Sequence, residues 1–243
     1  MISRRKMIAS IPAAGSLLLT ACKDSLPPTY GSLFDLSNTL TFASHRVLLR
    51  NQPLVREFAR DRITKNFPAI NETNPKDDRY QHLLAGAFAE WRLPIAGLVS
   101  RPAELSLDTL KRLPSRTQVT QHNCEQGWSA IAEWTGVPLG RVLREVGMSP
   151  HARYVVFHTV DGWWDSLDMF DALHPQTLLA YGMNGGELPV RHGAPVRLRV
   201  ERQLGYKSLK FLSRIDVTDR LDDVEDGTGA VGAAYGYSWY AGI

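Results

Sequence analysis

The chain has 243 residues, of which 44% are hydrophobic and 22% are charged, a length and composition that suit one domain with a sizeable buried core. Its formal net charge is +3, and Arg4, Arg5 and Lys6 supply that much positive charge at the start of the chain. The remainder is therefore close to neutral, and the composition gives no support to a nucleic-acid-binding surface.

The first residues have the pattern of an export signal. Arg4 and Arg5 precede the apolar run 8–21, which is shorter than the roughly 20 residues that a membrane-spanning helix needs. The adjacent arginines after Ser3 resemble the twin-arginine signal, which exports proteins already folded around a cofactor. An ordinary secretory signal with two chance arginines is the alternative. On either interpretation, we expect residues 1–21 to be an export signal.

Cys22 predicts attachment to a membrane by lipid. Residues 19–22, Leu-Thr-Ala-Cys, resemble a bacterial lipobox, in which the cysteine becomes lipid-modified, and Asp24 resembles the signal that retains lipoproteins at the inner membrane. Residues 22–33 are mostly polar and contain two adjacent prolines, which suits a tether. No later stretch is apolar for long enough to span a bilayer. We therefore expect a lipid-anchored domain, residues 34–243, on the periplasmic side of the inner membrane.

The folded part is predicted to be an α+β domain in which strands dominate. Apolar residues at helical spacing predict helices over 46–58, 80–88, 106–112 and 139–146. Short β-branched and aromatic segments between Gly and Pro predict strands over 95–99, 117–121, 130–134, 154–159, 178–183, 196–200 and 209–218. Asn184-Gly185-Gly186 predicts a hairpin turn before 188–190. Neither a G-x-G-x-x-G after a strand nor a Walker loop is present, which argues against nucleotide sites.

Cys124 is the most informative single residue. The chain has two cysteines, and if Cys22 carries a lipid, Cys124 has no partner for an intramolecular disulfide. A lone thiol outside the cytoplasm tends to oxidise or to pair with another chain. Cys124 is therefore either buried and inert or held as a thiolate by a metal.

Five segments together resemble the sulfite oxidase superfamily of molybdopterin enzymes. They cover roughly residues 90 to 218 in order, which makes the resemblance more specific than any one motif. The segments are His122–Trp128, Glu133–Leu139, Ala180–Gly185, His192–Arg197 and Gly205–Lys210. The resemblance implies a β-rich mixed fold, a Mo-molybdopterin cofactor, and Cys124 as the protein ligand of molybdenum, for which a thiolate is a suitably soft donor.

The resemblance also implies which residues surround the cofactor. The pterin and its anionic phosphate need cations and free N–H groups. By position in the matching motifs, cofactor contacts are expected at Thr159, His192, Arg197, Lys207, Ser208, Leu209 and Lys210. His45 and Arg46 are the nearest candidates for a contact upstream of the cysteine, and His122, Glu125 and Tyr206 are candidates for proton movement. Each of these cations taken alone is equally consistent with a solvated surface charge.

Two aromatic segments leave alternatives open. Trp163, Trp164 and Ser166 follow a predicted strand and either line the mouth of a substrate site or close the core. Residues 227–236 are rich in Gly and Ala and predict a surface loop. The aromatic end 237–240 either packs back on the body or covers a pocket.

The implied activity is two-electron oxygen-atom transfer to or from a small S- or N-oxide or a sulfite-like substrate. The chain has no C-x-x-C-H haem motif, so it resembles the catalytic-domain-only branch, which includes methionine-sulfoxide reductase catalytic subunits. It departs from them where Ser44-His45-Arg46 replaces an Asn-rich motif and where His192 replaces an asparagine, as in sulfite oxidases. Without an internal relay, electrons require a separate membrane haem or quinone-linked protein. A monomer is expected.

Two other classes of function compete with this one. The first is a lipid-anchored binding or assembly protein that has the fold and no catalysis, although a scaffold needs no thiol at position 124. The second is a cysteine hydrolase built on Cys124 and either His122 or His158, for which the acid and the oxyanion-hole context are missing.

Overall fold

The computed structural model describes residues 26–31 and 34–243. The predicted export signal 1–21, Cys22 and part of the predicted tether lie outside the described residues. Within the described ranges, none of the helices combines the length and apolar character needed to cross a membrane.

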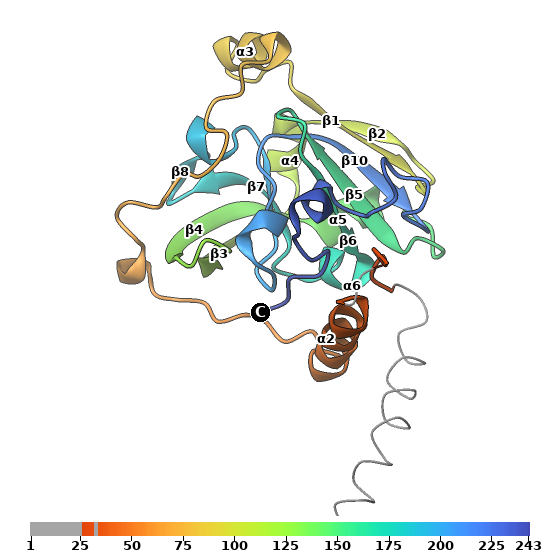
Figure 1. The fold of residues 1–243 in the computed structure, drawn as a ribbon. Helices are drawn as coiled ribbons and strands as arrows, with labels where there is room; N and C mark the ends of the chain where they lie inside the picture. The colour runs from red at the N-terminus through yellow and green to blue at the C-terminus, as the bar shows by residue number, and fades with distance from the viewer. Residues whose placement is uncertain (1–25, 32–33) are drawn as a thin grey trace, which may run out of the picture.

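Short helices and strands alternate along the described chain (Figure 1). The helices are α2 (Asp35–Leu48), α3 (Asp78–Ala85), α4 (Leu107–Arg112), α5 (Leu139–Glu145) and α6 (Met169–Ala172), with 3-10 turns η1 (Arg60–Arg62), η2 (Val190–His192), η3 (Gly205–Lys207) and η4 (Val231–Tyr235). The strands are β1 (Arg92–Gly97), β2 (Ala103–Ser106), β3 (Arg116–Asn123), β4 (Ser129–Pro138), β5 (Tyr154–Thr159), β6 (Trp164–Asp168), β7 (Leu178–Met183), β8 (Gly186–Glu187), β9 (Arg197–Arg199) and β10 (Leu212–Thr218).

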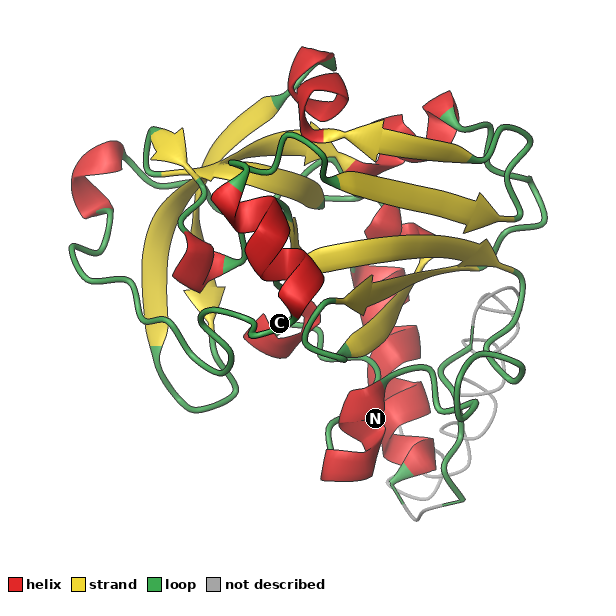
Figure 2. Ribbon diagram, turned by 90° about the horizontal axis from the view of Figure 1, so that it is seen from above, coloured by secondary structure: helices red, strands yellow, loops and turns green. Residues whose placement is uncertain are grey.

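The strands form two five-stranded sheets. The first has the order β2-β1-β10-β5-β6, and only its β1 and β10 pair in parallel, with Ile95 opposite Ile215. The second has the order β3-β4-β7-β8, with β9 pairing antiparallel to β7. Figure 2 shows both sheets from above, with short helices around them. The predicted α+β, strand-dominated fold class is confirmed.

One hydrophobic core joins the two sheets. Val155 and Phe157 of β5 and Leu179 of β7 are completely buried in the same cluster, to which α5 adds Val142 and Leu143. Strand β5 consists of β-branched and aromatic residues with little else, which fits a strand covered on both faces. Burial of this shared surface fixes how the two sheets meet, and the loops at their junction carry the cleft described below.

Local sequence explains where several helices begin and where one prediction fails. Asp77 and Ser106 cap α3 and α4, since their side chains accept hydrogen bonds from backbone N–H groups three residues later. The predicted helix 46–58 is wrong: α2 lies earlier, because Phe42 and Arg46 face inward from it, and the chain leaves the helix at Leu49, ahead of Pro53. Strands β2 and β6 were not predicted.

The hairpin turn is confirmed, but the strand after it is shorter than expected. Asn184 and Gly185 have φ values of 53° and 81°, the left-handed conformation that this sequence pattern favours. The returning strand β8 has two residues, and Val190, expected to be in a strand, begins the 3-10 turn η2.

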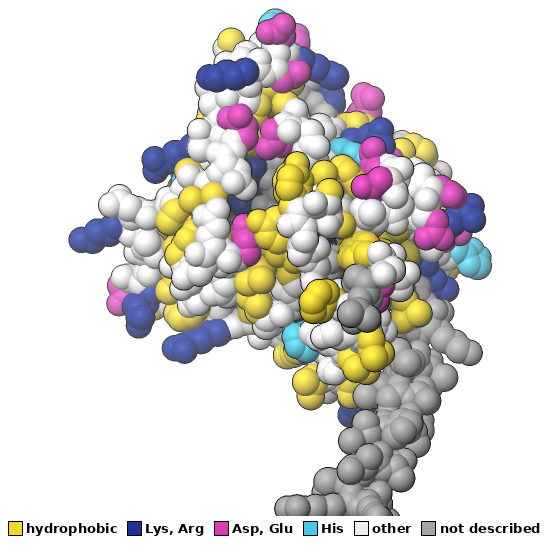
Figure 3. All heavy atoms as spheres, in the orientation of Figure 1, with side chains coloured by type: hydrophobic (Ala, Val, Ile, Leu, Met, Phe, Trp, Pro, Cys, Tyr) yellow, Lys and Arg dark blue, Asp and Glu magenta, His cyan; other side chains and the backbone are white. Residues whose placement is uncertain are grey.

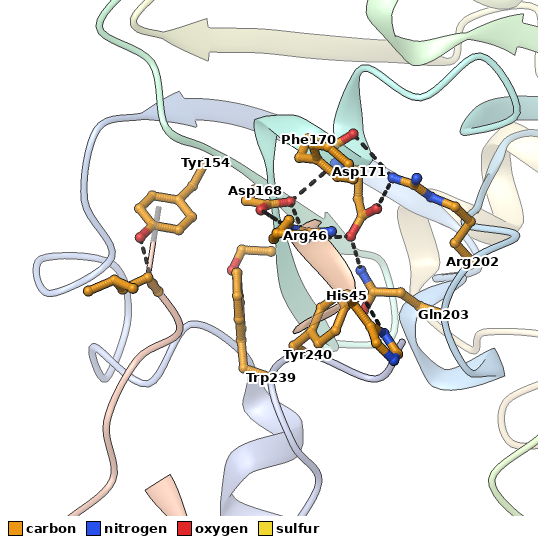
Figure 4. Close-up of polar contacts among 12 residues, drawn as sticks. His45, Arg46, Tyr154, Asp168, Phe170, Asp171, Arg202, Gln203, Trp239 and Tyr240 are labelled. Carbon is orange, nitrogen blue, oxygen red and sulfur yellow. Dashed lines mark hydrogen bonds and ion pairs between the residues drawn. The ribbon is translucent and has the colours of Figure 1, made fainter. Parts of the chain in front are cut away.

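Helix α2 is fastened to the body by a buried ion cluster (Figure 4). The Arg46 guanidinium donates to Asp168 Oδ1 at 3.0 Å and to Asp171 Oδ2 at 2.8 Å, and all three side chains are buried. Arg202 and Gln203 also donate to Asp171. Burial raises the pKa of Asp171, but Arg46 and Arg202 outweigh it and hold that pKa below its ordinary value.

We predict that Arg46→Leu lowers the free energy of unfolding by about 3–5 kcal/mol, because it leaves the buried Asp168 without its counter-charge and removes one of the two arginines that pair with Asp171. Denaturant titration followed by circular dichroism measures the loss. Arg50→Leu, at an exposed position two residues beyond the helix, serves as the control and should change stability by less than about 0.5 kcal/mol.

The same pair of variants separates a structural role of Arg46 from the cofactor contact expected from the sequence. Folded Arg46→Leu protein should keep its molybdenum content. Loss of molybdenum at unchanged stability would instead assign Arg46 to the cofactor.

Candidate active site

A cleft of about 310 Å³ opens where loops from both sheets meet. Its walls come from the loop after η1, the β3–β4 loop, the β5–β6 loop, the segment from η2 to β9, the segment around η3, and the C-terminal segment after β10. Of the residues predicted from the sequence, it brings together His122, Cys124, Glu125, Thr159, Trp163, His192, Arg197, Tyr206, Ser208, Leu209 and Lys210.

Cys124 begins the loop between β3 and β4 and lies in the wall of the cleft, 8% exposed. Its N–H donates to the Trp128 carbonyl at 2.9 Å and its carbonyl accepts from Gly127, whose φ of 88° lets the loop turn tightly. The thiol donates to Glu125 Oε2 at 3.5 Å. Burial, together with the Glu125 charge, raises the pKa of the Cys124 thiol. A thiolate here therefore needs a positive partner, and a bound metal ion is one.

His122 lies two residues before the thiol and has a fixed tautomer. Arg199 Nη1 lies 2.7 Å from His122 Nδ1, and because a guanidinium can only donate, Nδ1 accepts and Nε2 carries the proton. Burial, and then the charges of Arg199 and Arg197, lower the pKa of His122 to about 2. Gly205 leaves room for this ring, since a Cβ there would lie 2.5 Å from Nε2. His122 is thus a neutral N–H donor.

Arg197 is a buried cation at the cleft without a carboxylate partner among the described residues. It donates to the carbonyls of His192 at 2.9 Å and Ser208 at 2.8 Å, and its Nε has no hydrogen-bond partner. Burial, and then the nearby Arg199, lower its pKa well below the ordinary value. Arg199 differs because Glu201 pairs with it at 2.8 Å. The uncompensated charge of Arg197 favours an anion in the cleft.

Two further cationic or ionisable side chains line the same cleft. Lys210 Nζ donates to the Ile70 carbonyl at 2.7 Å, and burial and Arg197 lower its pKa to about 8. Burial and the neighbouring cations lower the pKa of His192 to about 4, so this imidazole is neutral. The positive charge near the cleft therefore comes from arginine and lysine.

Two stacked pairs of aromatic rings form part of the wall of the cleft. Trp163 and Tyr235 stack with centroids 5.8 Å apart and an interplanar angle of 13°, and Tyr206 and Tyr237 stack at 4.8 Å. Both pairs line the cleft and join its body to the C-terminal segment. Trp164 and Ser166 are buried in the core instead. The sequence left open whether these residues line a site or close the core, and the structure shows that Trp163 lines the cleft and the other two close the core.

The aromatic residues 237–240 near the end of the chain are likewise shared between the cleft and the core. Tyr237 reaches the cleft, whereas Trp239 and Tyr240 pack into a second core cluster with Phe42 of α2. The segment both packs on the body and borders the pocket.

The structure does not bring His45, Arg46 or Lys207 into the lining of the cleft. His45 Nδ1 contacts the Tyr240 hydroxyl at 3.1 Å, and Arg46 belongs to the ion cluster beneath α2. Lys207 is 1% exposed and uses its three donors on Asp165, the Ser166 carbonyl and the Trp239 carbonyl. Cofactor contacts of these three residues stay a prediction, and in the described structure their side chains pack the N- and C-terminal segments.

Tyr206 lines the cleft with its ring, but its hydroxyl donates to the Ser238 carbonyl at 2.6 Å, and burial raises its pKa. The proton that the sequence suggested for transfer is held in a bond to the C-terminal segment. Of the residues expected in proton movement, His122 and Glu125 keep polar groups next to Cys124.

Sequence reasoning missed Phe67 and Arg199. Phe67 lines the cleft and packs against four rings, those of His122, Trp128, Trp134 and His192, at 5.6–6.2 Å. It comes from an irregular loop, and no local pattern marks it. Arg199 follows Arg197 by two positions in a strand, which places both side chains on one face, so the strand periodicity could have found it.

Residues 82–224 match the family of the oxidoreductase molybdopterin binding domain, and the chain belongs to this family. It is therefore a molybdopterin-dependent oxidoreductase with the sulfite oxidase-type fold, and the predicted Mo-molybdopterin cofactor and superfamily are confirmed. This membership favours an enzyme over the binding protein and over the cysteine hydrolase.

Two curated relatives and one solved structure resemble the chain. A putative protein-methionine-sulfoxide reductase subunit, YedZ1, of Azospira oryzae is 40% identical over 180 residues, covering 74% of this chain and 64% of the relative. A protein-methionine-sulfoxide reductase catalytic subunit, MsrP, of Xanthomonas axonopodis pv. citri is 34% identical over 152 residues, covering 56% and 47%. The chain thus spans less than two thirds of each relative. The sulfane dehydrogenase SoxCD from Paracoccus pantotrophus has a TM-score of 0.52 and 26% identity over 59% of this chain and 40% of that one.

The residues at the cleft fit this cofactor. Arg197 offers a buried guanidinium with a free Nε to an anionic group, and Cys124 offers a thiol to a metal. Lys210 and the backbone around Ser208 lie on the same side as Arg197. Anion binders and a soft metal ligand are the two kinds of group that a metal-pterin phosphate requires.

We predict that Arg197→Gln lowers the molybdenum and pterin content of the purified protein, because it removes charge-assisted hydrogen bonds worth about 1.5–3 kcal/mol each. Metal analysis and fluorescence of the released pterin measure both. Arg144→Gln, at an exposed position on α5, is the matched control and should leave occupancy unchanged. Wild-type occupancy in a folded Arg197→Gln protein would contradict the assignment.

Proposed function

We propose that the protein reduces sulfoxides, with methionine sulfoxide as the substrate, and that Cys124 is the protein ligand of molybdenum. The observation that carries the proposal is the position of the thiol in the wall of a cleft that also holds the uncompensated Arg197. The relatives of Azospira and Xanthomonas are named as methionine-sulfoxide reductase subunits, which supports this substrate over sulfite.

Each residue at the cleft has a task in this proposal. When bound, the molybdenum cofactor supplies two-electron oxygen-atom transfer. Cys124 presents its sulfur to the metal from a loop held by the bonds between its backbone and those of Gly127 and Trp128. Arg197 and Lys210 hold the anionic part of the cofactor. His122 keeps one proton on Nε2, because Arg199 occupies Nδ1, and can donate a hydrogen bond without carrying charge.

The aromatic wall favours a substrate that is polar at one atom and apolar around it. A sulfoxide has one oxygen that accepts hydrogen bonds and two apolar substituents on sulfur. The stacked pairs of Trp163 with Tyr235 and Tyr206 with Tyr237 offer apolar faces to those substituents.

The test is a pair of dye-linked assays. A reduced dye donates electrons for reduction of methionine sulfoxide, dimethyl sulfoxide and trimethylamine oxide, and an oxidised dye accepts electrons for oxidation of sulfite. We predict reduction of methionine sulfoxide by the wild type, and loss of at least about 99% of that activity in Cys124→Ser, because an alkoxide is a harder and less electron-donating ligand than a thiolate.

Structure and pterin content of the serine variant should stay close to wild type, which separates the loss of the ligand from a loss of folding. A variant that turns over near the wild-type rate would refute Cys124 as the ligand. Oxidation of sulfite without reduction of any sulfoxide would refute the substrate and leave the ligand assignment standing.

We also propose that the protein is exported folded and tethered by a lipid on Cys22 to the periplasmic side of the inner membrane, where a haem or quinone-linked membrane protein supplies electrons. The sequence of residues 1–24 supports this location. The word subunit in the names of both relatives supports a separate partner. Tethering raises the effective concentration of the domain beside a membrane partner without requiring a large interface.

Changing Cys22→Ala is predicted to remove the protein from the membrane fraction that survives a high-salt wash, because no lipid remains to hold it. Fractionation and immunoblotting measure the change. Quinol-coupled activity of whole membranes should fall, while the dye-linked activity of the purified enzyme stays unchanged. Salt-resistant membrane attachment of the alanine variant equal to that of the wild type would overturn the lipid anchor.

A further inference from the structure

Exposed apolar side chains are concentrated near the beginning of the described chain. Nine large hydrophobic residues are exposed within the described ranges, and seven of them lie between residues 26 and 54. The two others are Tyr235, which lines the cleft, and Ile243. Figure 3 shows hydrophobic side chains over α2 at the lower end of the molecule. Exposed apolar surface of this kind, gathered at one place, marks a contact surface.

Helix α2 has more apolar surface than its packing on the body covers. Its inward face carries Phe42, Ala43 and the Arg46 stem, which are buried. Leu36, Leu40 and Val47 are 67%, 39% and 40% exposed, and their spacing of four and seven residues aligns them in one stripe along the helix. Leu48, 76% exposed, extends the apolar surface at the end of the helix. Ala43 lies in the same row, so the row borders the buried face, and the described residues leave its larger side chains uncovered.

The chain that follows this stripe carries positive charges. Between Asp35, in the first turn of the helix, and Glu57, no Asp or Glu occurs. Arg50 and Arg56 are exposed in that range, whereas Arg46 is neutralised beneath the helix. An exposed apolar stripe followed by exposed arginines suits a helix that lies in the interface of an anionic bilayer.

The chain outside the described residues places this surface near a membrane. Three residues lie between Cys22 and Leu26, so the two are four residue steps apart, a reach of at most ~14 Å in extended chain. The carbonyl of Leu26 accepts a hydrogen bond from the Tyr154 hydroxyl at 2.8 Å, so the body is fixed close to the predicted lipid (Figure 4). Figure 1 shows the start of the described chain beside α2.

We propose that the outer face of α2, formed by Leu36, Leu40, Val47 and Leu48, lies on an anionic lipid bilayer with Arg50 and Arg56 at the headgroups. The occupant of this face is the membrane itself and not a protein. The contact adds an orienting surface to the lipid anchor, and it holds α3, at the opposite end of the molecule, away from the bilayer (Figure 1). The proposal rests in part on the proposed lipid on Cys22, which would bring α2 near a bilayer, and does not depend on the substrate.

The test uses the cofactor-loaded chain from residue 22 onward with Cys22→Ala, so that no lipid contributes. Co-sedimentation is measured with vesicles of phosphatidylethanolamine and phosphatidylglycerol, and with neutral phosphatidylcholine vesicles. We expect binding to the anionic vesicles, a loss of about tenfold or more when Leu36, Leu40 and Val47 are changed together to Ser, and weaker binding to the neutral vesicles.

Two matched pairs test the arginines. Arg50→Gln with Arg56→Gln should weaken binding to the anionic vesicles, while Lys76→Gln with Arg79→Gln, exposed residues at α3, should leave it unchanged. Dye-linked activity should persist in every variant, which shows that each is folded and loaded.

Three results would overturn the proposal. They are no binding to either kind of vesicle, equal binding by the serine variant and its parent, and equal losses from the α2 and α3 arginine pairs. If the serine variant lost electron transfer from the membrane partner in detergent while no vesicle was bound, the surface would belong to a protein.

Discussion

The cleft depends on two arginines that β9 buries side by side. Arg197 and Arg199 project from the same face of one strand, and both guanidinium groups lie over the Trp134 ring, at 5.0 and 4.4 Å. Glu201 neutralises Arg199, which leaves it free to hold His122 in one tautomer. Arg197 has no such partner and makes the cleft attractive to an anion. One strand therefore sets both the charge of the site and the proton position of the histidine beside Cys124.

Burying these cations has a cost that the rest of the fold must offset. The pKa of Arg197 is lowered by burial, which shows that its charged form is unfavourable there without an anion. The carbonyls of His192 and Ser208 offset part of this, and an anionic group bound in the cleft would offset more.

The ends of the described chain are part of the same architecture. Arg46 holds α2 to Asp168 and Asp171, and Lys207 ties the C-terminal segment to Asp165 through the Trp239 carbonyl. The C-terminal segment in turn supplies Tyr235 and Tyr237 to the cleft. These two tyrosines lie beyond residues 82–224, which match the family, whereas their stacking partners Trp163 and Tyr206 lie within that range.

The sequence by itself determined those elements whose residue types favour one kind of local structure. Strand β5 is predictable because β-branched and aromatic residues favour a buried strand. The hairpin turn is predictable because Asn184 and Gly185 tolerate positive φ. The order of the motifs around Cys124, His192 and Lys210 was enough to indicate the family and its cofactor. These signals can be recognised from the sequence alone, because they are either local patterns or spacings along the chain.

Only the tertiary structure decided which cations serve the site. Arg46, Arg197 and Lys207 look alike in the sequence, yet Arg46 and Lys207 meet buried carboxylates from β6 and α6 and Arg197 meets none. Strand β6 escaped prediction for the same reason, since its aspartates resemble turn residues until Arg46 and Lys207 neutralise them. A charge is functional or structural according to its partner. Partners 40 to 125 residues apart are brought together by packing of the core, which no local pattern encodes.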